Sequence, residues 1–162
     1  MDHVAYMSAI GGSAFGGKKT ININWISKIL SGEKKIELRW YRTKHLPWGK
    51  IKTGDRIFLK NTGELVTVKS RVKRVLALEN LTPEKVREIL EKYGRDDGIA
   101  KEKMEYFYEL FSDKKYCLLI FLTRVEKVKP FGVDKSGFGQ MAAWITVEDI
   151  DIIKRNPAGA GR

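Results

Sequence analysis

The sequence predicts an α+β fold, because its strand-like and helix-like segments do not follow a repeating βαβ order. Residues 116–123 form a nearly all-apolar run of strand length, which is typical of a central barrel strand buried on both sides. Residues 65–76 carry β-branched valines with lysines and arginines between them, as a long strand does. Between these runs, Thr82 and Pro83 mark the start of a helix. Strands and helices in this order favour a mixed β-sheet with flanking helices.

The first elements along the chain are a strand over residues 4–8, a short helix over residues 24–31 and a strand over residues 34–41. Asn24 is a suitable N-cap for the helix, and Gly32 supplies its left-handed stop. Alternation along the strand places its apolar side chains, including Trp40, on one buried face. The opposite face carries a carboxylate and a guanidinium as i, i+2 neighbours, together with two further polar residues: Lys35, Glu37, Arg39 and Tyr41.

The later elements begin with a strand over residues 56–60, after a glycine-aspartate turn. In the long strand that follows, the apolar spacing slips after Val68, which predicts a bulge. A second helix, after the one at Thr82, covers residues 101–111, and we assign its aromatic stripe to the core rather than to a ligand site. Residues 125–131 continue the apolar strand, and Thr146 is expected to cap a terminal helix that ends at Ile153.

Length and composition predict one domain over residues 1–155, with a glycine-rich loop at about 11–20 and a flexible tail over 156–162. The 162-residue chain has neither an apolar run long enough to span a membrane nor a secretory signal pattern. Its single cysteine, Cys117, cannot form an intramolecular disulfide, so we expect a cytoplasmic protein. One glutamine among many charged residues is a balance typical of thermophiles.

The net charge of +11 is concentrated in one part of the chain. Residues 28–74 hold fourteen lysines and arginines against four acidic residues, whereas residues 75–162 hold fifteen of each sign. A local excess of this kind attracts polyanions, and bases can stack on the aromatic residues that lie among the same cations. The alternative is an ordinary solvated face of a stable protein. The pattern therefore indicates a nucleic-acid partner without establishing one.

Two other kinds of chemistry find little support. Residues 12–19 come within one position of a phosphate-binding P-loop, but Lys19 stands where a serine or threonine belongs. The segment that follows favours a strand, whereas a P-loop needs a helix there. The only two histidines, His3 and His45, are far apart in sequence, and Cys117 has no partner at ligand spacing. We therefore expect no metal and no cofactor.

A short motif carries the most specific information. Gly32, Lys34, Glu37 and Arg39 spell G-x-K-x-x-E-x-R, which resembles the signature of the ASCH domains, a branch of the PUA-like β-barrel superfamily. The similarity extends over residues 24–154, through the loop at 47–55 and the glycine-rich segment at 137–144, and is closest to archaeal members. It implies a PUA-like mixed β-barrel with flanking helices. Residues 11–20 depart from the family as an insertion.

The resemblance and the charge together predict a module that binds RNA or a nucleotide in a basic cleft around the motif. Arg39 would hold a phosphate or base edge, Lys34 would act as a point charge, and Glu37 would accept from a base or orient Arg39. The alternative for Glu37 and Arg39 is a structural ion pair. We expect Lys34→Ala and Arg39→Ala to lose affinity without unfolding. The full set of expected nucleic-acid contacts is Lys34, Arg39, Tyr41, Arg42, Lys44, Trp48, Lys50 and Lys60.

The runner-up is a hydrolase, an amidohydrolase of a modified nucleoside or a ribonuclease, in which Lys34 and Glu37 would be catalytic. Relatives of both kinds resemble ASCH proteins, and the motif lysine is assigned a catalytic role in them. As a base, Lys34 would need a lowered pKa. The short bacterial amidohydrolases have a nucleophilic threonine where this chain has Glu37, which would have to activate a water instead. Whether the protein is an enzyme, and its oligomeric state, stay open at this level.

Overall fold

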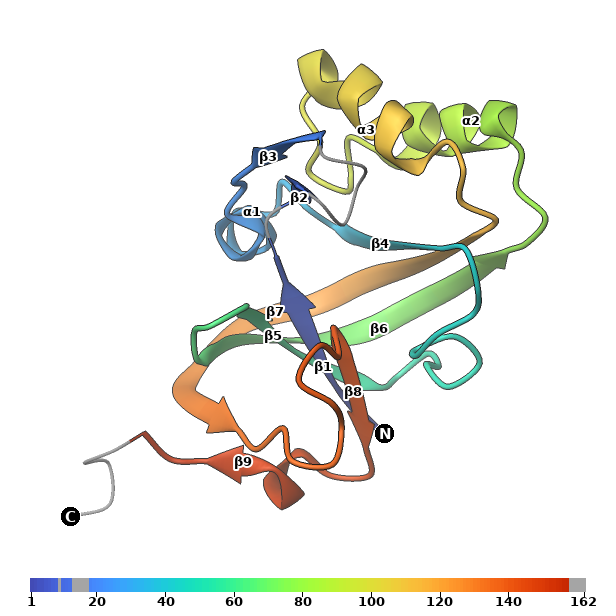
Figure 1. The fold of residues 1–162 in the computed structure, drawn as a ribbon. Coiled ribbons are helices and arrows are strands. Elements are labelled where there is room, and N and C mark those ends of the chain that lie inside the picture. The colour runs from blue at the N-terminus through green and yellow to red at the C-terminus, as the bar shows by residue number, and fades with distance from the viewer. Residues whose placement is uncertain (9, 13–17, 158–162) are drawn as a thin grey trace.

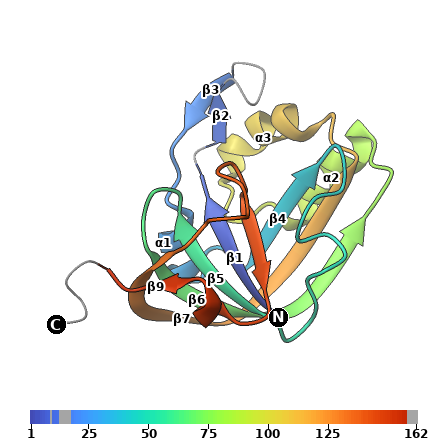
Figure 2. The same ribbon diagram turned by 60° about the horizontal axis from the view of Figure 1, so that its bottom comes forward.

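The computed structural model describes residues 1–8, 10–12 and 18–157, and its backbone is organised by one mixed sheet. The sheet curls into a half-barrel, as the two views in Figures 1 and 2 show. Strands β1 and β5 pair in parallel, and the other neighbours pair antiparallel. Its strands in spatial order are β4 (Ile36–Tyr41), β7 (Tyr116–Val133), β6 (Val66–Leu78), β5 (Arg56–Asn61), β1 (Asp2–Met7) and β8 (Trp144–Val147), with β9 (Lys154–Arg155) beside β7.

Three α-helices accompany the sheet, and two of them begin where their caps predict. Asn24 Oδ1 accepts from Ser27 N at 3.1 Å to start α1 (Trp25–Ser31), which ends at Gly32 with a left-handed φ of 82°. Thr82 caps α2 (Pro83–Tyr93) in the same way. A single 3-10 turn, η2 (Lys101–Lys103), leads into α3 (Met104–Phe111). The α+β class, with a curled mixed sheet and flanking helices, is thus confirmed.

Apolar side chains pack on both faces of β1. Ala5 and Met7 belong to a large core cluster that the helices also enter, whereas Val4 and Tyr6 belong to a smaller cluster on the opposite face. Alternation along a strand explains this division, because successive side chains point to opposite faces. The middle of the sheet is therefore buried on both sides, and β1 links the two clusters.

The long antiparallel pair β6 and β7 contains the bulge that the valine spacing predicts. The pairing register shifts between Val66 and Val68, again between Lys69 and Arg71, and again before Arg74. Residues 125–131 continue β7 as expected. Each register shift increases the local twist, which helps the two long strands to curl.

The prediction of a terminal helix from Thr146 to Ile153 is wrong. Residues from Trp144 to Val147 form β8, which pairs antiparallel with β1, and only the short 3-10 turn η3 (Ile150–Ile152) follows, capped by Asp149. The reason is that Trp144, Ile145 and Val147 are all buried in the sheet. Pairing with a strand at the other end of the chain outweighed a local capping pattern.

The glycine-rich segment includes a second small sheet. Strands β2 (Ile10–Gly12) and β3 (Lys18–Ile21) pair antiparallel, so a strand follows Lys18 where a P-loop would need a helix. Residues 13–17 of the expected loop, and residues 158–162 of the expected tail, lie outside the described part of the chain. The described residues include no helix long and apolar enough to cross a membrane.

Candidate functional site

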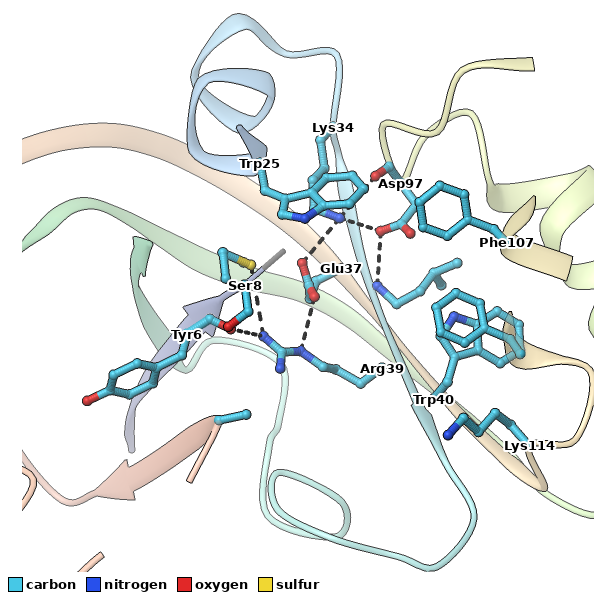
Figure 3. A pocket seen from close by; sticks show the side chains of 14 residues that line it. Tyr6, Ser8, Trp25, Lys34, Glu37, Arg39, Trp40, Asp97, Phe107 and Lys114 are labelled. Carbon is cyan, nitrogen blue, oxygen red and sulfur yellow. Dashed lines mark hydrogen bonds and ion pairs between the residues drawn. The ribbon is translucent and has the colours of Figure 1, made fainter. Parts of the chain in front are cut away.

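A cleft of about 270 Å³ opens between the start of β4, the end of β1 and helices α1 and α3, and Figure 3 shows it from close by. We call it the central cleft. Charged side chains from β4 lie at its base, and aromatic rings from the helices form part of its wall. Its lining residues are Tyr6, Met7, Ser8, Trp25, Lys34, Glu37, Leu38, Arg39, Trp40, Asp97, Phe107, Phe111, Lys114 and Ala143.

The loop after α2 is fastened to the start of β4. The backbone N–H groups of Lys35 and Ile36 both donate to Asp96 O, at 2.6 and 3.0 Å. Leu38 N donates to the carboxylate of Asp97 at 3.2 Å. These bonds bring a carboxylate from a loop about sixty positions downstream against the motif strand.

Four charged side chains meet at the base of the cleft: Lys34, Glu37, Arg39 and Asp97, which we call the charge quartet. Lys34 Nζ contacts the Asp97 carboxylate, lies 3.2 Å from Glu37 Oε2 and donates to Ile36 O at 2.9 Å. The other carboxylate oxygen of Glu37 lies 3.0 Å from Arg39 Nε. The quartet is therefore one connected group whose formal charges cancel.

The quartet is buried, which sets its protonation. Burial alone would lower the pKa of Lys34, but the carboxylates of Asp97 and Glu37 outweigh it and raise that pKa. Lys34 is 3% exposed and stays a cation at neutral pH. Burial, assisted by Glu37, raises the pKa of Asp97, while the attraction of Lys34 acts to lower it. The lysine is thus a fixed positive charge that favours the ionised form of the aspartate beside it.

Some polar atoms in the cleft are not fully used by the protein. Glu37 Oε2 and Arg39 Nε are within ion-pair distance of their partners but not in hydrogen-bond geometry, and Trp40 Nε1 has no acceptor among the described residues. All three atoms are buried. Buried polar groups are normally satisfied, so an acceptor and two donors of this kind are suited to a polar ligand.

Arg39 is held in place by a chain of contacts that runs along β1 to its first residues. Its guanidinium donates to Tyr6 O at 3.2 Å and lies 5.1 Å from the centre of the Trp144 ring. Trp144 Nε1 donates to His3 Nδ1 at 3.0 Å, which leaves His3 Nε2 to donate to Asp55 at 2.9 Å. His3 is fully buried, and burial lowers its pKa. A neutral, oriented imidazole thus fixes the indole that supports Arg39.

Aromatic rings give the cleft a flat lining. Trp40 stacks on Phe111 with ring centres 5.0 Å apart and an interplanar angle of 9°. Trp25 meets Phe107 edge to face at 6.3 Å, and Lys34 Nζ lies 5.0 Å from the centre of the Trp25 ring. Such faces can accept a planar group by stacking.

The structure divides the residues expected to bind nucleic acid into three groups. Lys34 and Arg39 meet in the central cleft with Glu37, whereas Lys60 lies at the end of β5, against the ring of Tyr6. A third group, which we call the 41–50 patch, lies at the far end of β4 and does not line the cleft: Tyr41, Arg42, Lys44, Trp48 and Lys50.

Within the 41–50 patch the rings pack against one another. Trp48 meets Tyr41 and Tyr116 edge to face, at 6.4 and 5.5 Å. Lys44 is paired with Glu79 at 2.6 Å, and Arg42 with Asp113. Half-buried Trp40 thus lines the cleft, whereas Tyr41 and Trp48, two of the residues expected to bind nucleic acid, pack together away from it.

Sequence reasoning missed the partners that complete the cleft: Trp25, Asp97, Phe107, Phe111 and Lys114. Asp97 follows another aspartate and precedes Gly98, which reads only as a turn. The two phenylalanines belong to the stripe assigned to the core, and they are indeed buried while also lining the cleft. Contacts between segments this far apart leave no local pattern.

No group of three or more potential metal-ligating side chains occurs within residues 1–8, 10–12 and 18–157. His45 lies in the exposed loop of the 41–50 patch, where its Nε2 is 2.9 Å from Thr43 Oγ1. The expectation that the protein uses no metal stays a prediction.

Comparison with known proteins identifies the fold. No family model and no curated protein sequence matches the chain. The crystal structure of ASCH from Zymomonas mobilis matches with a TM-score of 0.59 at 14% identity, covering 96% of both chains. A variant of that protein gives 0.62 at 14% identity, covering 93% of this chain and 91% of the other.

The N-terminal domain of Staphylothermus marinus McrB is also similar, with a TM-score of 0.51 at 11% identity, covering 93% of this chain and 90% of that domain. Identities this low carry the fold and not the activity. The chain therefore has the fold of these ASCH crystal structures, and its G-x-K-x-x-E-x-R motif lies at the base of the central cleft.

Proposed function

We propose that the protein is a PUA-like module that binds RNA or a nucleotide, with one base in the central cleft. The observation that carries the proposal is the charge quartet, a buried and electrically balanced group beside aromatic faces. A balanced group suits a base edge, which is polar but uncharged, better than it suits a phosphate. Arg39 and Trp40 would supply donors, and Glu37 would supply the acceptor.

The phosphates would find their partners outside the quartet. Residues 28–74 carry the excess of basic side chains, and many of these, such as Arg42, Lys44 and Lys50, are exposed. Neutralised phosphates release counterions, so affinity should fall steeply as salt rises. The division of labour is therefore a neutral base cleft within a positive surrounding, and of the two contacts expected for Arg39, a phosphate or a base edge, we propose the base edge.

The test is binding of a labelled single-stranded RNA, followed by fluorescence anisotropy at several salt concentrations. We expect Arg39→Gln to weaken binding about tenfold or more, because a hydrogen bond to a charged group contributes about 1.5–3 kcal/mol. Arg87→Gln is the matched control, since it also removes one charge and one ion pair, that with Glu105, from a site on α2. Thermal unfolding of both variants checks that the fold is kept.

Equal affinities for Arg39→Gln and Arg87→Gln would place the binding site elsewhere. Absence of RNA binding by the unaltered protein at low salt would remove the nucleic-acid proposal altogether.

The hydrolase alternative has less support from the geometry. A general base must release its proton near neutral pH, and the pKa of Lys34 is raised rather than lowered. Glu37 is engaged by Lys34 on one side and by Arg39 on the other, which leaves it poorly placed to activate a water. The binding function is therefore the one we propose.

A further inference from the structure

Two lysines converge on one tyrosine ring outside the central cleft. Lys60 Nζ lies 4.8 Å and Lys135 Nζ 4.3 Å from the centre of the Tyr6 ring. The Tyr6 ring belongs to the smaller core cluster, while its backbone oxygen accepts from Arg39 in the cleft. The lysine pair therefore lies on the opposite face of β1, and Tyr6, which also lines the cleft, connects the two places.

The charge of this pair is not compensated. Neither ammonium group has a carboxylate within 4.0 Å in the part of the chain that the structure describes, whereas Lys34, at the base of the cleft, has two. Burial, together with the nearby charge of Lys135, lowers the pKa of Lys60. Lys135 is held in position because its Nζ donates to Gln140 O at 2.7 Å. Two positive charges kept together without an acid favour an anion between or above them.

The segment 134–143 connects this pair to the mouth of the cleft. It joins β7 to β8 and runs beside β1, as Figure 1 shows. Ala143 lines the cleft, and its carbonyl accepts from Tyr6 N at 3.1 Å. Gly137 and Gly139, with φ values of 84° and 87°, allow the backbone to turn.

The same segment exposes apolar side chains. Met141 is 94% exposed and Phe138 is 38% exposed, close in sequence to the residue that lines the cleft. Isolated exposed apolar residues need no explanation. Here, however, the aromatic ring and the thioether belong to the same segment as Lys135, whose ammonium group has no carboxylate partner among the described residues. Stacking surface beside positive charge is the combination with which proteins hold single strands.

We propose that Lys60 and Lys135 bind the backbone phosphate, and Phe138 and Met141 the base, of the nucleotide next to the one in the cleft. The ligand is then a single-stranded RNA of at least two nucleotides, and a mononucleotide fills only half of the site. This rests on the proposed function, because it takes the cleft as the neighbouring subsite. The 41–50 patch is not needed for this second contact.

The experiment compares two ligands and three proteins. The ligands are a labelled mixed-sequence RNA of about twelve nucleotides, within the range that single-strand binding sites cover, and an equimolar mixture of the four ribonucleoside monophosphates as competitor. The proteins are the unaltered chain, Lys60→Ala/Lys135→Ala, and Lys85→Ala/Lys101→Ala. The last is the control, because it removes the same charge from exposed positions on α2 and η2.

We expect Lys60→Ala/Lys135→Ala to weaken RNA binding about tenfold. The slope of log affinity against log salt should become shallower by about 0.7–1.4, because contacts to one or two phosphates are lost. The affinity of the mononucleotide mixture, measured by competition, should be the same for this variant as for the unaltered protein. The control should keep the slope. Equal losses in both double variants, or an unchanged RNA affinity, would overturn the inference, as would a parallel loss of mononucleotide binding.

A second variant tests the apolar half of the surface. Phe138→Ala/Met141→Ala should lower RNA affinity by roughly fivefold or more through lost stacking, without changing the salt slope. Unaltered affinity would remove these two residues from the site. Failure of the proposed function looks different, because Arg39→Gln would then bind RNA as well as the unaltered chain does, whatever the lysine variants do.

Discussion

Lys34 has more partners than a binding lysine at a surface would have. Its ammonium group is enclosed by the carboxylates of Asp97 and Glu37 and by two backbone oxygens. Strand alternation placed Glu37 and Arg39 on one face, and the resemblance to the ASCH motif added Lys34 to them. Neither could identify Asp97, whose contact depends on how a distant loop folds back. The expectation that Lys34→Ala leaves the fold intact is therefore revised.

Replacement of Lys34 by methionine should destabilise the protein by about 3–5 kcal/mol, because two buried carboxylates lose their shared cation. Urea unfolding measures this directly. The double variant Lys34→Met/Asp97→Asn should recover part of the loss, since only Glu37 then remains charged beside Arg39. If Lys34→Met were as stable as the unaltered protein, the quartet would not be the compact charged group described. For the same reason Arg39, which is more exposed, is the better residue for testing binding.

At the level of elements, the start of β4 depends on the loop around Gly98. This loop packs against β4 although it lies far from it in the sequence. Gly98 has a φ of 82°, and a Cβ there would lie 3.2 Å from Lys34 Cβ and 3.3 Å from Lys28 Cδ. Lys28 Nζ also donates to Gly98 O at 2.9 Å, so α1, β4 and this loop meet at one point. A glycine is required here both for its backbone angle and for its lack of a side chain.

The substitution Gly98→Ala should therefore cost more stability than the same change at a glycine with free space around it. Gly63 is the matched control, because its φ is 84° and no atom lies within 4 Å of a Cβ built there. Gly63→Ala should cost about 1–2 kcal/mol for the left-handed backbone alone. Gly98→Ala should cost about 1–3 kcal/mol more through overpacking. Equal losses of stability for the two variants would show that the close approach to Lys34 has no energetic weight.

The sequence predicted those elements whose signals are local. The caps of α1 and α2 and the slipped valine spacing of β6 were all confirmed, because each depends on residues a few positions apart. The prediction for the terminal segment failed, because β8 exists only through its pairing with β1. Local capping chemistry cannot reveal a partner that lies about 140 residues away.

At the level of the whole molecule, the fold combines two features that are separate in the sequence. The basic excess belongs to residues 28–74, which also carry the charged motif of the cleft, whereas the aromatic part of the cleft comes largely from α1 and α3. The sequence therefore contained the motif and predicted the fold class, but it did not predict which rings line the central cleft. Trp40 stacks on Phe111 and Trp48 packs against Tyr116, and both are long-range contacts that leave no local pattern.

The most direct test of the cleft as the binding site uses the chain's four tryptophans as reporters. Their indole N–H signals would be followed by nitrogen-edited NMR during titration with single-stranded RNA, and assigned with single Trp→Phe variants. The account predicts that the Trp40 signal shifts most, because its buried Nε1 lacks an acceptor and lines the cleft, while Trp48 in the 41–50 patch stays near its free position. A shift of Trp48 with Trp40 unmoved would contradict the account and place the RNA on the patch instead.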